Sequence, residues 1–342
     1  MNYTFPDIKK NEPLTLITMN GIGDLCWAFV KIANFKKAYN IPKIKLKLHL
    51  AGDQRDGRVN DIVERFSFVD EYESMRFNIH KEHIVENRRL AYIESGYNDA
   101  GEYTFIPNAH LEWQGRIEEI FPDVTPCYDF FDKYYKCDPK DVRKACDFRK
   151  QGKINNTACN SFICFHLGST NTNTHNGMNR FQKWRLEDWA ALVRAIRGYC
   201  DLPIYILGAH YDNEYALKFI DVLNRMKYNA NVLNLCGKTS ASLMIEMLRI
   251  SALTVSFASG VAIASTYLGT PTIMFWMPEE KSVSINRDIG FSNKFSTNWV
   301  PPNILNSTYY PAFYFVDNIN TVSRISRNFL EMTRAKINQG YL

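Results

Sequence analysis

The sequence lacks several patterns that would place it quickly in a known class of protein. Its eight cysteines form no C-x-x-C pair and no zinc-like Cys and His spacing, which argues against a disulfide framework or a structural metal site. The first residues contain no apolar core after a basic start, so secretion through a signal peptide is not expected. No internal repeat or low-complexity tract is present. We therefore expect a folded cytoplasmic protein with reduced thiols and no bound metal.

The chain also lacks a strong excess of one charge. Its net charge is +5, and residues 1–150 hold 23 Lys and Arg against 24 Asp and Glu, so the positive excess lies in the second half. A long nucleic-acid track usually needs a denser basic stripe, whereas a mild excess suits a small phosphorylated ligand.

One long stretch, from residue 250 to residue 278, contains no charged side chain at all. It is long enough to span a bilayer, which takes about 20 apolar residues. However, Ser259 and Gly260 interrupt it with a turn, and Gly269 and Pro271 are typical of a helix end followed by a new strand. The pattern favours strand, helix, strand, because strands covered on both faces need continuous apolar runs.

Strand and helix signals alternate along the whole chain. The first half has strands in "LTLITM" and "KIKLKLHLAG", separated by a glycine turn and a helix. The second half repeats the rhythm from "SFICFHLGST" to "PTIMFW". This alternation predicts an α/β fold with mostly parallel sheets, and 342 residues favour two domains. We expect an N-terminal domain over 1–155, a second domain over 156–320, and a terminal helix over 321–342 packing back across the junction.

Three turns that follow predicted strands could bind phosphate, because a helix N-terminus presents N–H groups and a partial positive charge. They are the turn with Gly21 and Gly23, the turn from Gly168 to Thr170, and Ser259 with Gly260. Each alone is equally typical of an ordinary strand–helix connection.

The order of these pieces resembles the heptosyltransferase-type glycosyltransferases of family 9. The matching segments are "GIGDL", "FHLGST…QKWRLEDWAALVRAI", "PIYILGAHYDNE", "NLCGKTSASLMIEML" and "SGVAIASTYLGTPTIMF". The resemblance implies a GT-B fold, in which two Rossmann-like, doubly wound domains face each other across a cleft. It further implies an inverting, metal-independent transferase without a cofactor. Such an enzyme moves a sugar from a nucleotide-sugar co-substrate to a hydroxyl acceptor.

By position, the resemblance assigns the catalytic base to Asp24. A carboxylate can take the proton from an acceptor hydroxyl as its oxygen attacks the sugar. The alternative is that Asp24 only caps its helix.

The remaining assignments concern the donor. The resemblance places the cations of Arg180 and Lys183 at the diphosphate leaving group. Ser169 and Thr170 add phosphate donors, and Glu214 falls where the family's acid binds the nucleotide ribose. The alternatives are a solvated loop for the cations and a favourable helix-dipole partner for Glu214.

The chain departs from the family at its last motif. There the family has Asp-Ser-Gly-Pro-x-His, but Ala258 and Ile263 stand in place of the acid and the imidazole. Ser259 and Gly260 still offer phosphate donors, whereas side-chain contacts to the donor are put in doubt.

The sequence leaves several functions open. A surface glycan of the lipopolysaccharide type is the family's default acceptor, and a hydroxymethylated DNA base, acted on by a viral enzyme in an infected host cell, is the alternative. A non-catalytic sugar-nucleotide binder is an alternative of another class, and a location at the membrane periphery is an alternative to the cytoplasm. A nicotinamide oxidoreductase is disfavoured because Cys26 stands where its fingerprint needs a third glycine.

Overall fold

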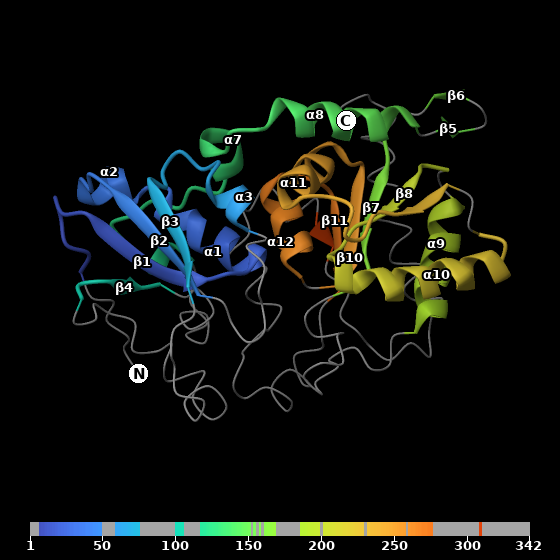
Figure 1. The fold of residues 1–342 in the computed structure, drawn as a ribbon, viewed down its shortest axis with the longest axis horizontal. Coiled ribbons are helices and arrows are strands. Elements are labelled where there is room, and N and C mark those ends of the chain that lie inside the picture. Colours follow the sequence, from blue (N-terminus) through green and yellow to red (C-terminus); the bar gives the residue numbers. More distant parts are fainter. Residues whose placement is uncertain are drawn as a thin grey trace. The chain divides into compact units, whose positions relative to one another are not determined.

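The computed structural model of the chain describes two α/β regions (Figure 1). The described residues are 7–49, 59–75, 100–105, 117–151, 153–154, 157–158, 161–168, 185–198, 201–228, 231–257, 259–275 and 308–309. The predicted terminal helix over 321–342 lies outside them.

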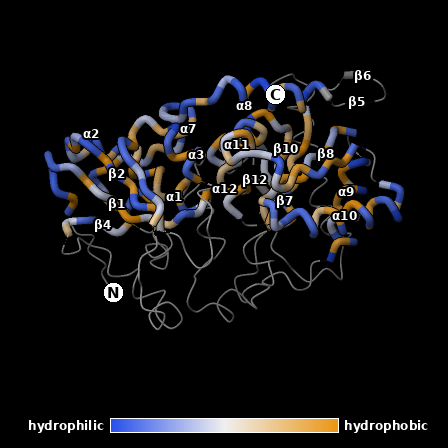
Figure 2. The backbone as a smooth tube through the Cα atoms, viewed as in Figure 1, coloured by the Kyte–Doolittle hydropathy of each residue, from blue (hydrophilic) through white to orange (hydrophobic). Residues whose placement is uncertain are grey.

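The described residues form two compact units, which divide between Lys136 and Cys137. This division lies earlier in the chain than the junction predicted near residue 155. Helix α8 (Pro139–Gln151) accounts for the difference, because it packs against α11 (Ala241–Ile250) of the second unit. The hydroxyl of Ser242 on α11 donates a hydrogen bond of 2.6 Å to Asp141 on α8. Figure 2 shows α8 as predominantly hydrophilic, so its attachment is not evident from apolar patterning.

The first unit contains a parallel four-stranded sheet in the order β3-β2-β1-β4. Its described elements are β1 (Leu14–Met19), α1 (Ile22–Ile32), α2 (Phe35–Tyr39), β2 (Ile44–His49), α3 (Asn60–Val63), β3 (Glu71–Met75), β4 (Tyr103–Thr104), η1 (Ile117–Glu119) and α7 (Phe130–Tyr134). The strand predicted over 14–19 and the following glycine turn are confirmed. The single helix predicted after that turn is divided in two at Asn34, whose side chain donates to the carbonyl of Thr125 at 2.8 Å.

Helix α1 is buried along most of its length, and an aromatic cluster anchors it. Phe29 contacts the rings of Phe66, Phe68 and Phe130 at centroid distances of 4.8 to 6.0 Å. Edge-to-face pairs of this kind stabilise a core beyond their buried area. The helix is therefore held rigidly where it follows β1.

A buried lysine adds a polar anchor to the same helix. The Lys31 side chain is fully buried, and its Nζ donates to the carbonyl oxygens of Val124 at 2.6 Å and Phe121 at 3.4 Å. Burial lowers the pKa of Lys31 to about 8, although the charge of Glu118 acts in the opposite direction. The lysine thus ties α1 to the segment after η1.

This lysine should leave a signature in the pH dependence of stability. Between about pH 8 and about pH 10.4, the ordinary pKa of a lysine side chain, Lys31 has lost its proton in the folded state but keeps it in the unfolded state. The unfolded state then binds more protons, so the free energy of unfolding rises with pH. We expect wild type to gain up to about 3 kcal/mol over Lys31→Met across this range. Urea denaturation of both proteins at several pH values measures the difference, and a constant difference would contradict the expectation.

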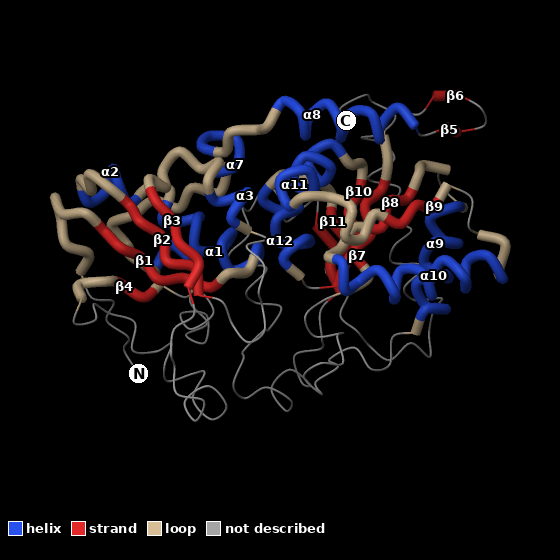
Figure 3. Tube along the Cα trace, in the orientation of Figure 1, coloured by secondary structure: helices blue, strands red, loops and turns tan. Residues whose placement is uncertain are grey.

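The second unit contains a six-stranded sheet in the order β12-β11-β10-β7-β8-β9, in which all neighbours are parallel. Its elements besides α8 and α11 are β5 (Lys153–Ile154), β6 (Thr157–Ala158), β7 (Ile163–His166), α9 (Leu186–Arg197), β8 (Ile204–Ile206), η3 (His210–Asp212), α10 (Asn213–Arg225), β9 (Val232–Asn234), β10 (Leu253–Phe257), α12 (Gly260–Tyr267), β11 (Thr272–Phe275) and β12 (Thr308–Tyr309). Helices α9 and α10 cover one face of the sheet and α11 and α12 the other (Figure 3).

The core of this unit explains the long uncharged stretch of the sequence. Trp189 on α9 is fully buried and contacts the rings of Phe165, Phe257 and Phe275 from three adjacent strands. The stretch itself folds as β10, α12 and β11, and Gly269 ends the helix region with a φ of 73°. Within the described residues, no helix is long and apolar enough to cross a membrane. The predicted order of strand, helix and strand is confirmed.

Candidate functional site

The strand orders place one candidate position in each unit. In the second unit, chain order runs outward in both directions from the adjacent strands β7 and β10. Open α/β sheets bind ligands outside the carboxyl ends of their strands, at the point where the strand order reverses. In the first unit the corresponding point lies between β1 and β4. Residues that follow β1, β7 and β10 are therefore the first candidates for function.

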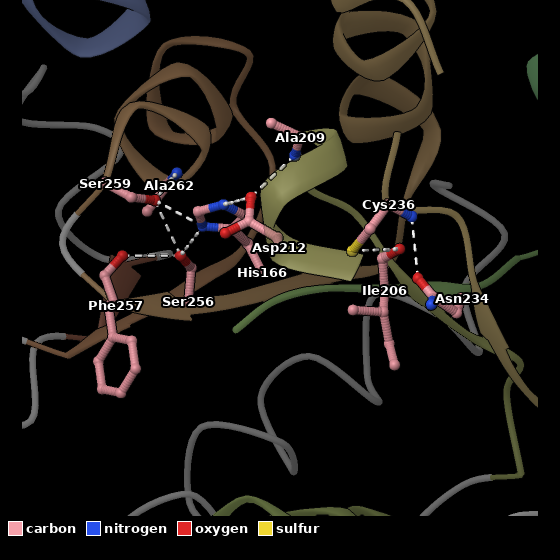
Figure 4. Close-up of polar contacts among 10 residues, drawn as sticks. All are labelled: His166, Ile206, Ala209, Asp212, Asn234, Cys236, Ser256, Phe257, Ser259 and Ala262. Carbon is pink, nitrogen blue, oxygen red and sulfur yellow. Dashed lines mark hydrogen bonds and ion pairs between the residues drawn. The ribbon is translucent and has the colours of Figure 1, made fainter. Parts of the chain in front are cut away.

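Polar side chains gather at this point of the second unit (Figure 4). His166 ends β7 and pairs in register with Ser256 on β10. Its Nδ1 lies 3.2 Å from the hydroxyl of Ser256 and 3.1 Å from that of Ser259. Ser259 is the N-cap of α12, and its hydroxyl accepts a hydrogen bond from the backbone N–H of Ala262 at 3.4 Å. The imidazole is thus connected to the start of α12.

Asp212 lies on the other side of the same imidazole. Its Oδ2 is 3.9 Å from Nε2 of His166 and accepts a hydrogen bond of 2.8 Å from the backbone N–H of Ala209. Both side chains are buried, with 9% and 7% of their surfaces exposed. Burial lowers the pKa of His166, and the charge of Asp212 acts against that effect. The histidine is therefore neutral at pH 7, with a carboxylate beside it.

Two glycines make room for the Asp212 carboxylate. A methyl group at Gly168, after β7, would lie 2.9 Å from the Asp212 Cγ. A methyl group at Gly208, after β8, would lie 2.8 Å from both Cβ and Oδ2 of Asp212 and 3.0 Å from Sγ of Cys236. Neither glycine has a left-handed backbone. Glycine is therefore required at these positions because a side chain would collide with Asp212, and not because of the backbone conformation. The predicted glycine turn at Gly168 and the glycine after β8 thus both leave space for one acidic side chain.

Asp24 lies in the first turn of α1 in the first unit. The N-cap of that helix is Gly21, which has an extended backbone (φ −128°, ψ 135°) and no side chain of its own to cap the helix. The Asp24 carboxyl folds back over Gly21, where an added methyl group would lie 3.4 Å from its Cγ and closer still to Oδ2. Asp24 is therefore not the N-cap residue itself. A carboxyl in the first turn that folds back over the N-cap can still cap the helix, so the capping alternative stays open. Asp24 follows β1, as a ligand-binding residue at the reversal point would.

This contact predicts that Gly21 positions the Asp24 carboxyl. The backbone angles of Gly21 suit any residue, so Gly21→Ala should leave the fold intact while its methyl group displaces the carboxyl. We expect a loss of activity of roughly tenfold or more, since misplacement by about 1 Å costs up to about 100-fold. Gly198→Ala is the matched control, because its methyl group would meet only the carbonyl of Ala195 at 3.3 Å. Equal turnover in the two variants would refute the positioning role.

The other predicted donor residues have different outcomes. Ser259 and Gly260 lie at the start of α12 beside His166. Glu214 is fully exposed on α10 and pairs with Lys218 at 2.7 Å, which lowers the pKa of its carboxyl. The structure does not bring Glu214 into the cluster. The residues predicted in the loop after β7 lie outside the described residues: Ser169, Thr170, Arg180 and Lys183.

Two residues of the cluster were not predicted from the sequence. His166 closes an apolar strand, where a histidine is usually a core residue, and Asp212 precedes a helix that offers Glu214 as a second acid. The signal that could have found them is their position along the chain. His166 ends β7, and Asp212 lies in the turn after β8, at the carboxyl edge of the sheet. Among the described residues, no group of three His, Cys, Asp or Glu could hold a metal ion, and the metal-independent reaction stays a prediction.

Comparison with known proteins relates this architecture to one class of fold. No family model matches the sequence, and no curated protein matches it. Solved structures do match. One is ADP-heptose lps heptosyltransferase II of E. coli, with 11% identity and a TM-score of 0.57 over 94% of this chain and 99% of that one. Another is the glycosyl transferase family 9 protein of Veillonella parvula, with 12% identity and a TM-score of 0.53 over 92% and 89%.

At such low identity the likeness establishes the fold alone. It confirms the predicted GT-B architecture of two Rossmann-like α/β domains, which the parallel sheets of both units also display. The resemblance inferred from the motifs is thereby confirmed at the level of the fold. What the chain does is argued below from its own residues.

Proposed function

We propose that this chain is a nucleotide-sugar-dependent glycosyltransferase. The observation that carries the proposal is the cluster at the reversal point of the second sheet, where the N-terminus of α12 meets Ser259 and His166. The first N–H groups of a helix have no partner inside it and attract phosphate. Two structures of the same fold are glycosyltransferases by name, and one name includes ADP-heptose.

The proposed reaction is a single displacement at the anomeric carbon. Asp24 takes the proton from the acceptor hydroxyl while that oxygen forms a bond to the anomeric carbon. The bond between the anomeric carbon and the phosphate oxygen breaks, and its electron pair leaves with the nucleoside diphosphate. Helix dipole and N–H groups at Gly260 stabilise this charge, as do the predicted cations Arg180 and Lys183. The configuration at the anomeric carbon inverts, because the acceptor oxygen attacks the face opposite the leaving diphosphate and only one displacement takes place.

The thiol next to Asp24 does not compete for this role. Burial, and then the charge of Asp24, raise the pKa of Cys26 above its usual value. A thiol held neutral in this way is a poor nucleophile. Of the two neighbours, the half-buried Asp24 carboxylate is the group available to accept a proton.

The donor can be identified by ligand-induced stabilisation. A ligand that binds the folded state raises the melting temperature according to its concentration relative to its Kd. We expect one nucleoside diphosphate, and the nucleotide sugars derived from it, to give a clear shift among the adenine, uracil and guanine series. No shift from any of them would contradict the proposal.

The acceptor class can be separated by salt dependence. We propose a surface glycan of the lipopolysaccharide type, with a hydroxymethylated DNA base as the alternative. Binding to DNA weakens steeply as salt rises, because phosphate contacts release counterions. If the affinity for the acceptor falls only slightly as salt rises, the DNA alternative is excluded. If it falls steeply, DNA replaces the glycan as the proposed acceptor.

A further inference from the structure

The reaction proposed above gives no role to the most enclosed part of the cluster. His166 is buried between an acidic side chain and a hydroxyl that caps a helix, and it ends a strand at the reversal point (Figure 4). Buried titratable groups held in such surroundings are often functional. The hydrogen bonds around the ring indicate what this one does.

The network assigns the proton of the neutral imidazole to Nε2. Ser256 donates its hydroxyl hydrogen to the carbonyl of Phe257 at 2.7 Å, so it can only accept from its two other neighbours, His166 and the Ser259 hydroxyl 3.0 Å away. A proton on Nδ1 would leave the Nε2 lone pair facing the Asp212 carboxylate, which is repulsive. With the proton on Nε2, the N–H faces the Asp212 carboxylate 3.9 Å away. Ser259 then has two acceptors for its hydroxyl hydrogen, Nδ1 at 3.1 Å and the Ser256 oxygen at 3.0 Å. The bare imidazole nitrogen is the stronger acceptor, so Nδ1 takes that hydrogen.

Ser259 is therefore a shared group. Its hydroxyl hydrogen serves His166 in the free protein, but the same hydroxyl stands at the end of α12, where the donor diphosphate is proposed to bind. If the hydroxyl turns to donate to a phosphate oxygen, Nδ1 of His166 loses its hydrogen bond. An anion nearby and Asp212 on the far side then both favour a proton on that nitrogen.

Few other groups compete for this proton within the described residues. Asp212 comes from η3, while β10 and α12 present only the hydroxyls of Ser256 and Ser259. Cys236, which follows β9, faces Asp212 and stays a neutral thiol, because burial and then the charge of Asp212 raise its pKa to about 12. The proton balance of the cluster thus depends on His166.

We propose that His166 is a positioning residue that acts through Ser259 and takes up a proton when the diphosphate of the donor binds at the N-terminus of α12. This inference rests on the proposed function, because it uses the donor site assigned there. Its consequence is that the affinity for the donor depends on pH. The affinity rises as the pH falls through the pKa that His166 has in the complex, and it becomes constant below the pKa that His166 has in the free protein.

The test measures the Kd of a nucleotide sugar between about pH 8 and pH 5.5. ADP-glucose and UDP-glucose are suitable probes, because their diphosphate diesters keep their charge over this range, whereas free diphosphates titrate within it. A neighbouring opposite charge shifts a pKa by about 1–3 units, and each unit corresponds to a tenfold change in affinity. We expect wild type to bind about tenfold more tightly at the acidic end.

Two variants assign the effect to the right side chain. His166→Gln cannot titrate and should show a Kd that does not change with pH. His210→Gln is the matched control, because His210 is exposed and belongs to the same η3 turn as Asp212, and it should follow wild type. Equal slopes in wild type and His166→Gln would overturn the inference while leaving the proposed function intact.

A second measurement covers the case in which His166→Gln does not fold. Calorimetric titration of wild type in buffers of different ionisation enthalpy counts the protons taken up on binding. Uptake that peaks between the two pKa values supports the inference, and no uptake at any pH overturns it. If neither nucleotide sugar nor any other member of the panel binds, the proposed function fails and this inference fails with it.

Discussion

Asp24→Asn should reduce glycosyl transfer by roughly 100- to 10,000-fold, the usual contribution of a general base. The substitution keeps the size of the side chain that folds back over Gly21, so it removes the basic group and little else. Donor binding should be unchanged, because the proposed donor site is built from residues of the second unit. The measurement is kcat with the donor identified by thermal shift, together with the Kd of that donor.

Matched controls separate the base from a structural role. Asp123→Asn changes an exposed carboxylate of the same unit and should leave turnover at the wild-type level. If Asp24→Asn kept full turnover, the base would have to be another residue. If it lost stability and donor binding together, Asp24 would be a structural residue, and a non-catalytic sugar-nucleotide binder would become the better description of the chain.

The pattern of apolar residues predicted most of the fold because strand and helix signals here agree with tertiary burial. In the second unit, the alternation of strands and helices expected from the sequence is observed from β7 to β11, with the short η3 turn as an addition. The uncharged stretch was interpreted correctly because its sequence signal is local. Gly269 was expected to end a helix, and its positive φ is the backbone conformation that such a helix end requires. Local residues determine such features, so the sequence alone reveals them.

What could not be predicted depends on contacts between distant segments. Helix α8 is charged and lies where the composition changes, but it belongs to the second unit because Asp141 and its neighbours meet α11. Composition cannot report such a contact. For the same reason, composition places the boundary near residue 155, whereas the contacts group α8 with the second unit.

The choice between two acids illustrates the same limit within the site. Asp212 and Glu214 are two residues apart, and either could follow a strand toward a ligand. The short η3 turn points Asp212 to the strand ends, whereas α10 begins at Asn213 and directs Glu214 to solvent. The position at which η3 ends and α10 begins decides which acid faces His166, and no sequence pattern specifies that position.

The crowding around Asp212 leads to the second large prediction. Gly168→Ala should lower the free energy of unfolding by about 1–3 kcal/mol, the usual cost of overpacking, because its methyl group meets Cγ and both carboxyl oxygens of Asp212. The carboxylate would then lose its hydrogen bond from Ala209 and its place beside His166. Gly208→Ala should cost a similar amount, since its methyl group meets Asp212 and Cys236.

A double-mutant cycle distinguishes the two glycines. Asp212→Ala removes the three atoms nearest to a methyl group at Gly168, but it leaves Cβ of Asp212 and Sγ of Cys236 in contact with one at Gly208. We therefore expect Asp212→Ala to relieve the destabilisation of Gly168→Ala, with a coupling energy of about 0.5–3 kcal/mol. It should leave most of the cost of Gly208→Ala in place. Denaturant midpoints of the single and paired variants measure this, and additive effects at Gly168 would mean that the glycine does not serve to seat the carboxylate.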